Sequence, residues 1–305
     1  MGPQVHRLRH YAFNTWILIK ESVNEWSVDR ATSKGAALAF YTVFSLAPIL
    51  ILAIAIAGFF FGEQAARGEI VAQVSGLVGP EGAIAVQALI ENAARPGAGL
   101  WAALFGIVAL FFGATTALAE LKDGLDEIWD VPLEKRRGFL YFMTKRATSI
   151  GLILALGFLL LVSLVLSAAL TALARFWHGA DALSVVLQLL NFVISFGLVT
   201  VLFATIYKVL PGVRIAWRDV IVGAAVTALL FSIGKYLIGV YIGNSGISSS
   251  YGAAGSVVLV LVWVYYSTQI FLLGAEFTKT YTYRFGSRRH QQHPRITSAD
   301  EATPQ

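Results

Sequence analysis

The sequence predicts an all-α membrane protein with six transmembrane helices. Three observations lead to this fold class. The 305-residue chain is 57% hydrophobic. Its charged residues make up 13%, whereas a soluble protein carries about 25%. Finally, six stretches are apolar over the roughly 20 residues that a bilayer-spanning helix needs. These stretches are residues 36–61, 99–120, 148–173, 184–208, 219–242 and 253–278.

Lys and Arg are distributed unevenly between the segments that connect the six stretches. All 23 except Arg67, Arg95, Arg175 and Lys235 lie in the N-terminal segment, the second and fourth connections and the C-terminal tail. Cytoplasmic segments of membrane proteins carry an excess of basic residues. The sequence therefore predicts a multi-pass protein with both termini in the cytoplasm.

The bundle is expected to have a short segment at each end. The N-terminal segment carries Trp16 and Trp26 beside basic residues, which is typical of a helix lying in the membrane interface. A soluble cap over the cytoplasmic side fits the same residues. The tail is polar and expected to be disordered. The predicted parts are an interfacial helix in residues 1–33, the six-helix bundle in residues 34–284 and the tail in residues 285–305.

The outer segment between the first two spans, residues 63–97, is expected to form a short helical hairpin. Gly79-Pro80 divides it, and Pro80 suits the first turn of a second helix. The hairpin would cover the outer side of the bundle or recruit a periplasmic partner.

Lys235 stands out because it lies within an otherwise apolar span. A charge at membrane depth is costly and usually faces a protein interior or a watery cavity. The small residues around it recur every three or four positions, so they share one helix face suited to close packing. Alternatively, the long lysine stem carries the amine to the outer interface. The residues of this face are Ala224, Ala228, Ser232, Lys235, Gly239 and Gly243.

We expect Lys235, Asn191 and Tyr236 to form a substrate-binding site in the outer half of the bundle. The sequence offers Lys235 no acidic residue at its own depth. An anionic ligand, such as a phosphate or carboxylate head group, would therefore suit it. Ligation of the amine by carbonyl and hydroxyl groups is the alternative.

A second polar layer is expected near the cytoplasmic face, where it would act as a gate. Tyr41 and Pro48 lie on the inward face of the first span, and Pro48 is expected to kink that helix. Lys34, Glu120 and Glu276 would form an ion cluster there. Glu276 is otherwise a solvated acid at a helix end or a structural partner of Lys279.

The sequence predicts no catalytic residue, no metal site and no cofactor. It has no Cys, which excludes thiol catalysis and disulfides, and it lacks the common phosphate-binding and hydrolase motifs. Its five His residues are scattered. The acidic run Asp123, Asp126, Glu127 and Asp130 is interpreted as a solvated helix end. The basic run at residues 135–137 indicates contact with anionic lipid, so no nucleic-acid partner is expected.

Three stretches resemble the YihY/BrkB family of bacterial inner-membrane proteins. They are KGAALAFYTVFSLAP at residues 34–48, YKVLPGVRIAWR at 207–218 and LVWVYYSTQIFLLGAE at 261–276. The resemblance covers roughly residues 10–285. It implies six helices with both termini inside the cell, which agrees with the distribution of basic residues. The family was once labelled ribonuclease BN, a misassignment, and it offers no catalytic residues to carry over.

The resemblance and the polar faces together predict a translocator of an anionic amphiphile, such as a lipid or lipid precursor. Other family members are linked to serum resistance and to export of lipid or lipopolysaccharide precursors. Membrane lipids are the expected partners. The alternative is a non-transporting scaffold in envelope assembly, whose polar faces only join helices. A ribonuclease finds no support in these residues, and the sequence does not give the oligomeric state.

Overall fold

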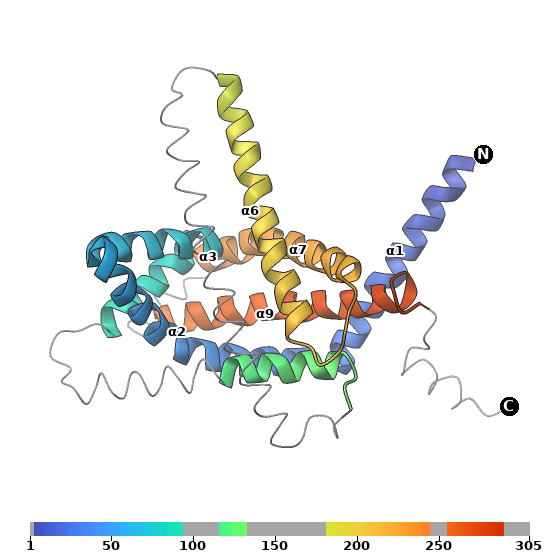
Figure 1. Cartoon of the computed structure of the whole chain (residues 1–305), viewed down its shortest axis with the longest axis horizontal. Coiled ribbons are helices and arrows are strands. Elements are labelled where there is room, and N and C mark those ends of the chain that lie inside the picture. Colours follow the sequence, from blue (N-terminus) through green and yellow to red (C-terminus); the bar gives the residue numbers. More distant parts are fainter. Residues whose placement is uncertain (1–2, 94–115, 133–180, 245–254, 290–305) are drawn as a thin grey trace. The chain divides into compact units, whose positions relative to one another are not determined.

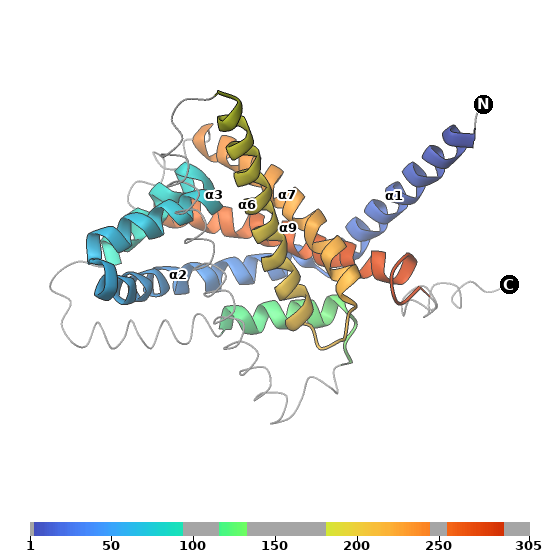
Figure 2. The same cartoon turned by 45° about the horizontal axis from the view of Figure 1, so that its top comes forward.

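The computed structural model describes residues 3–93, 116–132, 181–244 and 255–289, which contain helices and no strand. Figures 1 and 2 show the helices from two directions. Residues 116–128 form a further helix. The labelled helices are α1 (Pro3–Val28), α2 (Ala31–Phe61), α3 (Glu63–Ala93), α6 (Asp181–Val209), α7 (Trp217–Asn244) and α9 (Gly255–Arg284).

Three helices in the described part of the chain are long and apolar enough to cross a membrane. Their apolar stretches are Phe192–Val209, Trp217–Tyr241 and Val257–Arg284, and they match the fourth, fifth and sixth expected spans. The first expected span lies within α2. Most of the second and all of the third fall outside the described residues. The all-helical class is confirmed, while the count of six spans and the orientation stay predictions.

The expected division of the outer segment at Gly79-Pro80 is wrong. Helix α3 runs without interruption from Glu63 to Ala93. A proline removes one backbone hydrogen bond and can bend a helix without ending it. The turn lies earlier, at Gly62, whose φ of 85° is a conformation that glycine adopts without steric cost. Helix α3 therefore follows α2 directly, and in Figures 1 and 2 its second half turns back toward its start.

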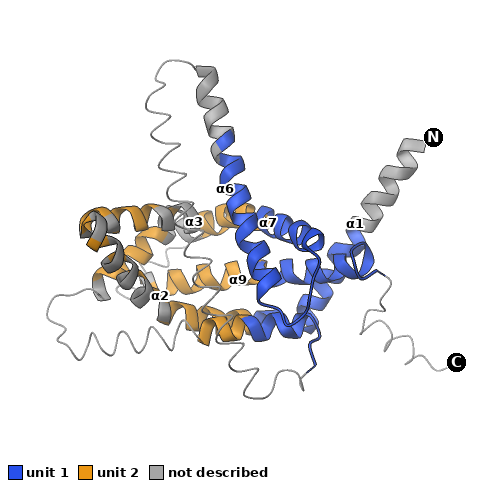
Figure 3. Ribbon diagram, viewed as in Figure 1, with its two compact units in different colours: residues 1–32, 122–229, 271–305 blue, residues 33–121, 230–270 orange. Residues whose placement is uncertain are grey.

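The described residues fall into two compact units, coloured separately in Figure 3. Unit 2 comprises residues 33–121 and 230–270. Its core joins α2, α3, α7 and α9, so the second half of α3 packs with the spans. Between helices in a membrane, such side chains hold the unit together through close van der Waals packing. The core residues are Ala39, Val43, Leu50, Ile54, Ala85, Val86, Ile90, Ile238, Leu259, Val260 and Val264.

Unit 1 comprises residues 1–32, 122–229 and 271–305. In it, α7 and α9 approach closely through small residues. A Cβ on Gly223 would lie 1.9 Å from Thr278 Oγ1, and one on Gly274 would lie 2.0 Å from Thr227 Oγ1. Each glycine therefore accommodates a threonine of the other helix. The expected small-residue face of α7 is confirmed at Ala224 and Ala228, which are fully buried.

The C-terminal end of α9 is fastened to the start of α7 within unit 1. Asp219, in the first turn of α7, accepts hydrogen bonds from the backbone N–H and the hydroxyl of Ser287 at 2.9 and 2.7 Å. Arg288 donates to the Arg214 carbonyl at 2.9 Å. Residues 285–289, where the polar tail begins, are thus held against the unit. The remainder of the tail lies outside the described residues.

Candidate functional site

Helices α1 and α9 face each other in unit 1 through charged side chains spaced one turn apart. We call this set the charge ladder. Its three steps are Glu21 with Arg284, Glu25 with Lys279, and Asp29 with Glu276. Positions four apart lie on one helix face. Residues 21, 25 and 29 of α1 therefore meet residues 284, 279 and 276 of α9, which runs antiparallel to α1.

Burial increases along the charge ladder. Arg284 donates to Glu21 through two nitrogens, and both side chains are about one-third exposed. At the next step the Lys279 ammonium lies 3.9 Å from Glu25, with side-chain exposures of 0% and 17%. Asp29 and Glu276 are buried, at 3% and 0% exposure. The ladder thus leads from the solvent into the interior of the unit.

The end of α1 places its last acidic residue at the innermost step. The Asp29 N–H donates to the Glu25 carbonyl at 2.8 Å, which continues the helical pattern beyond Val28. Arg30 then adopts a φ of 51°, in the left-handed region that non-glycine residues rarely occupy. The chain makes a turn immediately after Asp29, and α2 begins at Ala31.

A further carboxylate reaches the two inner steps of the charge ladder from the turn that follows the helix at residues 116–128. Asp130 Oδ2 lies 2.6 Å from Lys279 Nζ, and the lysine is completely buried. Asp130 has a φ of 50°, and the following Val131 N–H donates to the Asp126 carbonyl at 2.8 Å. This turn is a common way to end a helix. It directs Asp130 to the only cation of the innermost two ladder steps.

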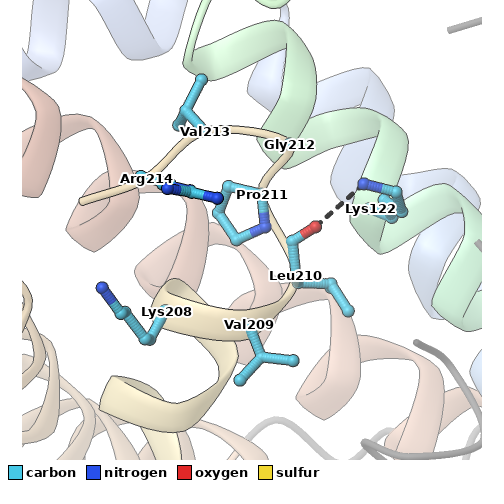
Figure 4. Close-up of a pocket in the computed structure, with 8 residues that line it drawn as sticks. All are labelled: Lys122, Lys208, Val209, Leu210, Pro211, Gly212, Val213 and Arg214. Atoms are coloured by element: carbon cyan, nitrogen blue, oxygen red, sulfur yellow. Dashed lines mark hydrogen bonds between the residues drawn. The ribbon is translucent and has the colours of Figure 1, made fainter. Parts of the chain in front are cut away.

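A second polar feature of unit 1 is a pocket of about 290 Å³ at the end of α6. In the view of Figure 4, Lys208 and Arg214 lie on one side of Pro211 and Lys122 on the other. Apolar side chains and the backbone of the connection between α6 and α7 complete the lining. We call it the basic pocket. Its residues are Lys122, Lys208, Val209, Leu210, Pro211, Gly212, Val213 and Arg214.

The shape of the basic pocket depends on a buried ion pair. Lys122 donates to Asp126 and to the Leu210 carbonyl, both at 3.0 Å, and Asp126 accepts the Gly212 N–H at 2.6 Å. Asp126 is fully buried, so our interpretation of the acidic run as a solvated helix end is wrong at this residue. The helical pattern placed Asp126 on a charged segment, but one of its partners, the Gly212 N–H, comes from a connection far along the chain.

Replacing Asp126 by asparagine is expected to lower the free energy of unfolding by about 1.5 kcal/mol, the lower range for a hydrogen bond to a charged group. The change keeps the shape of the side chain but removes the charge that Lys122 faces. Thermal unfolding of the purified protein in detergent measures it. Glu127→Gln, on the exposed side of the same helix, is the control and should leave stability within about 0.5 kcal/mol. Equal effects of both changes would contradict the assigned role of Asp126.

The expected substrate-binding residues are distributed over both units. Lys235 is half-buried in α7 and Tyr236 is 72% exposed, both in unit 2. Lys235 already takes part in an interaction, so the absence of a partner is no longer a reason to place a ligand there. Asn191 belongs to α6 of unit 1, and its side chain lies outside the described residues. Their grouping into one site stays a prediction.

The expected gate residues are similarly divided. Lys34, Tyr41 and Glu120 are half-buried residues of unit 2. Pro48 lies inside the continuous helix α2, with its side chain outside the described residues. Glu276 belongs to unit 1, where its neighbours are Asp29, Glu25 and Lys279. The ion cluster with Lys34 and Glu120 therefore stays a prediction.

Sequence reasoning missed the partners that α1 supplies to Glu276. The acidic residues Glu21, Glu25 and Asp29 recur every four positions, and this spacing was a usable signal. The same spacing separates Glu276, Thr280 and Arg284 on α9. Nothing local in the sequence says that these two faces meet, because the Glu21–Arg284 pair joins residues 263 positions apart.

The chain is similar to known membrane proteins over most of its length. The chain matches the family model described as virulence factor BrkB over residues 22–297. It is 28% identical to a UPF0761 membrane protein of Pseudoalteromonas atlantica, over 98% of this chain and 96% of that relative. No solved structure matches it.

Other relatives share a shorter part of their length with this chain. A UPF0761 membrane protein of Tolumonas auensis is 32% identical over 57% of this chain and 56% of its own length. One of Pseudomonas aeruginosa is 29% identical over 81% of this chain and 58% of its own length. The chain spans little more than half the length of these two relatives.

Proposed function

Because the chain belongs to the virulence factor BrkB family of membrane proteins, we propose that it translocates an anionic amphiphile across the cytoplasmic membrane. A lipid or lipid precursor is the substrate class. The protein would be a multi-pass inner-membrane protein with both termini in the cytoplasm and without enzymatic activity. Membrane lipids would be its immediate partners.

The basic pocket is the observation that carries this proposal. It combines the cationic groups of Lys208 and Arg214 with apolar lining residues such as Val209 and Val213. It also lies directly at the end of the apolar stretch Phe192–Val209. An amphiphile needs this combination, because its head group seeks charge-assisted hydrogen bonds and its tail seeks apolar surface. We therefore assign the pocket to the cytoplasmic head-group position.

The remaining polar groups extend the proposed path. Lys235, Asn191 and Tyr236 would receive the head group in the outer half of the bundle. Lys34, Tyr41, Pro48, Glu120 and Glu276 would form the cytoplasmic gate. Since no nucleotide-binding motif is present in the sequence, movement would follow the lipid gradient, be coupled to an ion or depend on a partner protein.

Transport in reconstituted liposomes tests the proposal. Proteoliposomes would carry trace fluorescent phosphatidylglycerol or phosphatidylcholine, and an impermeant quencher would report the fraction of probe in the outer leaflet over time. The double variant Lys208→Gln/Arg214→Gln removes two charges from the basic pocket. We expect anionic-probe movement to fall about tenfold, as the loss of about 1.4 kcal/mol of interaction implies.

The matched control is Lys20→Gln/Arg218→Gln, which removes one Lys and one Arg that are exposed and do not line the pocket. It should retain wild-type transport. Lys235→Ala should also slow the anionic probe, and full transport by a folded Lys235→Ala protein would remove Lys235 from the path. No probe movement by the wild-type protein, or equal losses in both double variants, would argue against translocation through the basic pocket.

A scaffold role is the second candidate, and one observation favours it. The Tyr207 hydroxyl donates to the Phe271 carbonyl at 2.7 Å and lies 3.1 Å from the Thr227 hydroxyl. These groups of α6, α7 and α9 satisfy one another rather than facing a cavity. Reactivity separates the two functions: a cysteine at Asn191 should react with a water-soluble thiol reagent only if that part of the bundle is hydrated.

A further inference from the structure

The innermost step of the charge ladder reverses the electrostatic pattern of the outer two. Glu21 meets Arg284 and Glu25 meets Lys279, so two acids of α1 each have a basic residue opposite. Asp29, the next acid on the same face, instead approaches the carboxylate of Glu276. This like-charged step is also the most buried of the three, where repulsion is screened least.

Negative charge exceeds positive charge around Glu276. From α1, Glu25 and Asp29 face it, and Lys279 of its own helix is the nearby cation. Lys279 is also the partner of Asp130, at 2.6 Å. The carboxylates of Glu25 and Asp130 thus already lie beside the Lys279 ammonium group.

The environment of Glu276 indicates that a positively charged group is required between the acids. Its side chain is completely buried, yet neither of its carboxylate oxygens accepts a hydrogen bond from the described residues. A buried carboxylate is strongly disfavoured unless it is paired, hydrogen-bonded or coordinated to a metal. Its oxygens point toward those of Glu25 and Asp29, because one oxygen from each of the three residues lies within 4.8 Å of the other two.

We propose that Glu25, Asp29 and Glu276 bind a hard divalent cation at the innermost step of the charge ladder. Carboxylate oxygens are the ligands that such cations prefer. Oxygens coordinated to one Ca²⁺ ion are at most about 5 Å apart, since each bond is about 2.3–2.6 Å long. The three carboxylates fit that limit. A divalent ion also offsets more of the excess charge than a monovalent ion or a shared proton.

The site is accessible through its outer ligand. The side chain of Glu25 is 17% exposed, whereas Asp29 and Glu276 are buried. A cation would therefore enter from the solvent along the charge ladder and be retained by the buried pair. The sequence predicted no metal site because Cys is absent and His is scattered, and it did not bring the acids of α1 together with Glu276. The site does not depend on the proposed translocation.

Binding of Mn²⁺ to the purified full-length protein is the direct measurement. The protein would first be treated with a chelator in detergent. Mn²⁺ would then be titrated, with free ion measured by electron paramagnetic resonance, and Ca²⁺ and Mg²⁺ would be added as competitors. We expect saturable binding of one ion per chain that Ca²⁺ or Mg²⁺ reverses. The melting temperature should rise on binding.

Glu276→Gln and Asp29→Asn remove one ligand charge each while keeping the side-chain shape. We expect each to weaken Mn²⁺ binding more than about tenfold and to abolish the cation-induced rise in melting temperature. Glu21→Gln is the matched control, because it changes the same type of residue on the same face of α1 at an oppositely charged step. It should retain the wild-type affinity.

Three results would overturn the site. They are the absence of saturable Mn²⁺ binding by the wild-type protein, retention of wild-type affinity by a folded Glu276→Gln variant, and a melting temperature that responds to pH but not to divalent cations. The last result would mean that a shared proton occupies the step. If Glu276→Gln does not fold, Asp29→Asn and Glu25→Gln make the same test.

Discussion

Replacing Lys279 by methionine is expected to lower the free energy of unfolding by about 3–5 kcal/mol, the usual cost of removing one partner from a buried ion pair. Methionine keeps the length and apolar stem of lysine but removes its charge. Lys279 is completely buried and lies 2.6 Å from Asp130 and 3.9 Å from Glu25. Without it, Asp130 and Glu25 lose this buried cation. Denaturant unfolding in detergent micelles measures the loss.

Arg284→Met provides the comparison for Lys279→Met. Arg284 also pairs with an acid of α1, but its side chain is 37% exposed and that of Glu21 is 34% exposed. Exposed ion pairs contribute about 0–1 kcal/mol, so this variant should remain close to wild type. A loss as large as that of Lys279→Met would mean that the charge ladder acts as a whole. Wild-type stability of Lys279→Met would show that the lysine is not buried among the acids.

The spans were predictable because the required information is local. A helix rises about 1.5 Å per residue and a bilayer core is about 30 Å thick, so length and apolar content are sufficient. The stretches Phe192–Val209, Trp217–Tyr241 and Val257–Arg284 confirm this reasoning. Helix α3 shows its limit. Gly79-Pro80 is a strong local stop signal, yet Val86 and Ile90 pack into the core of unit 2 and the helix continues through the proline.

The candidate sites were harder to predict because they depend on contacts between distant segments. Glu276 was singled out by its depth, but its carboxylate neighbours are supplied by α1, a segment interpreted from its tryptophans as interfacial. The burial of Asp126 likewise depends on Gly212, 86 residues away. Residue type and spacing identify a charged face, whereas the element that covers it is decided by the tertiary fold.

Gly274→Val is expected to lower the free energy of unfolding by about 3 kcal/mol, the upper range of the usual cost of overpacking. A Cβ at this position would lie 2.0 Å from Thr227 Oγ1 and 2.7 Å from the Tyr207 hydroxyl. Both neighbours are buried and hydrogen-bonded to backbone carbonyls. Neither can move without losing a hydrogen bond, so α7 and α9 would have to separate.

Gly197→Val is the control for Gly274→Val. It tests whether the lower free energy of unfolding comes from the steric contact or from replacing any helical glycine by valine. Gly197 is also helical, but a Cβ there would meet no atom within 4 Å. Valine has a higher helix propensity than glycine, so this variant should match or slightly exceed wild-type stability. Combining Gly274→Val with Thr227→Ala should recover part of the loss, because contacting positions are not additive. If the effects of the two changes on the free energy of unfolding are fully additive, Gly274 and Thr227 do not contact each other. That result would refute the close approach of α7 and α9 at this point in unit 1.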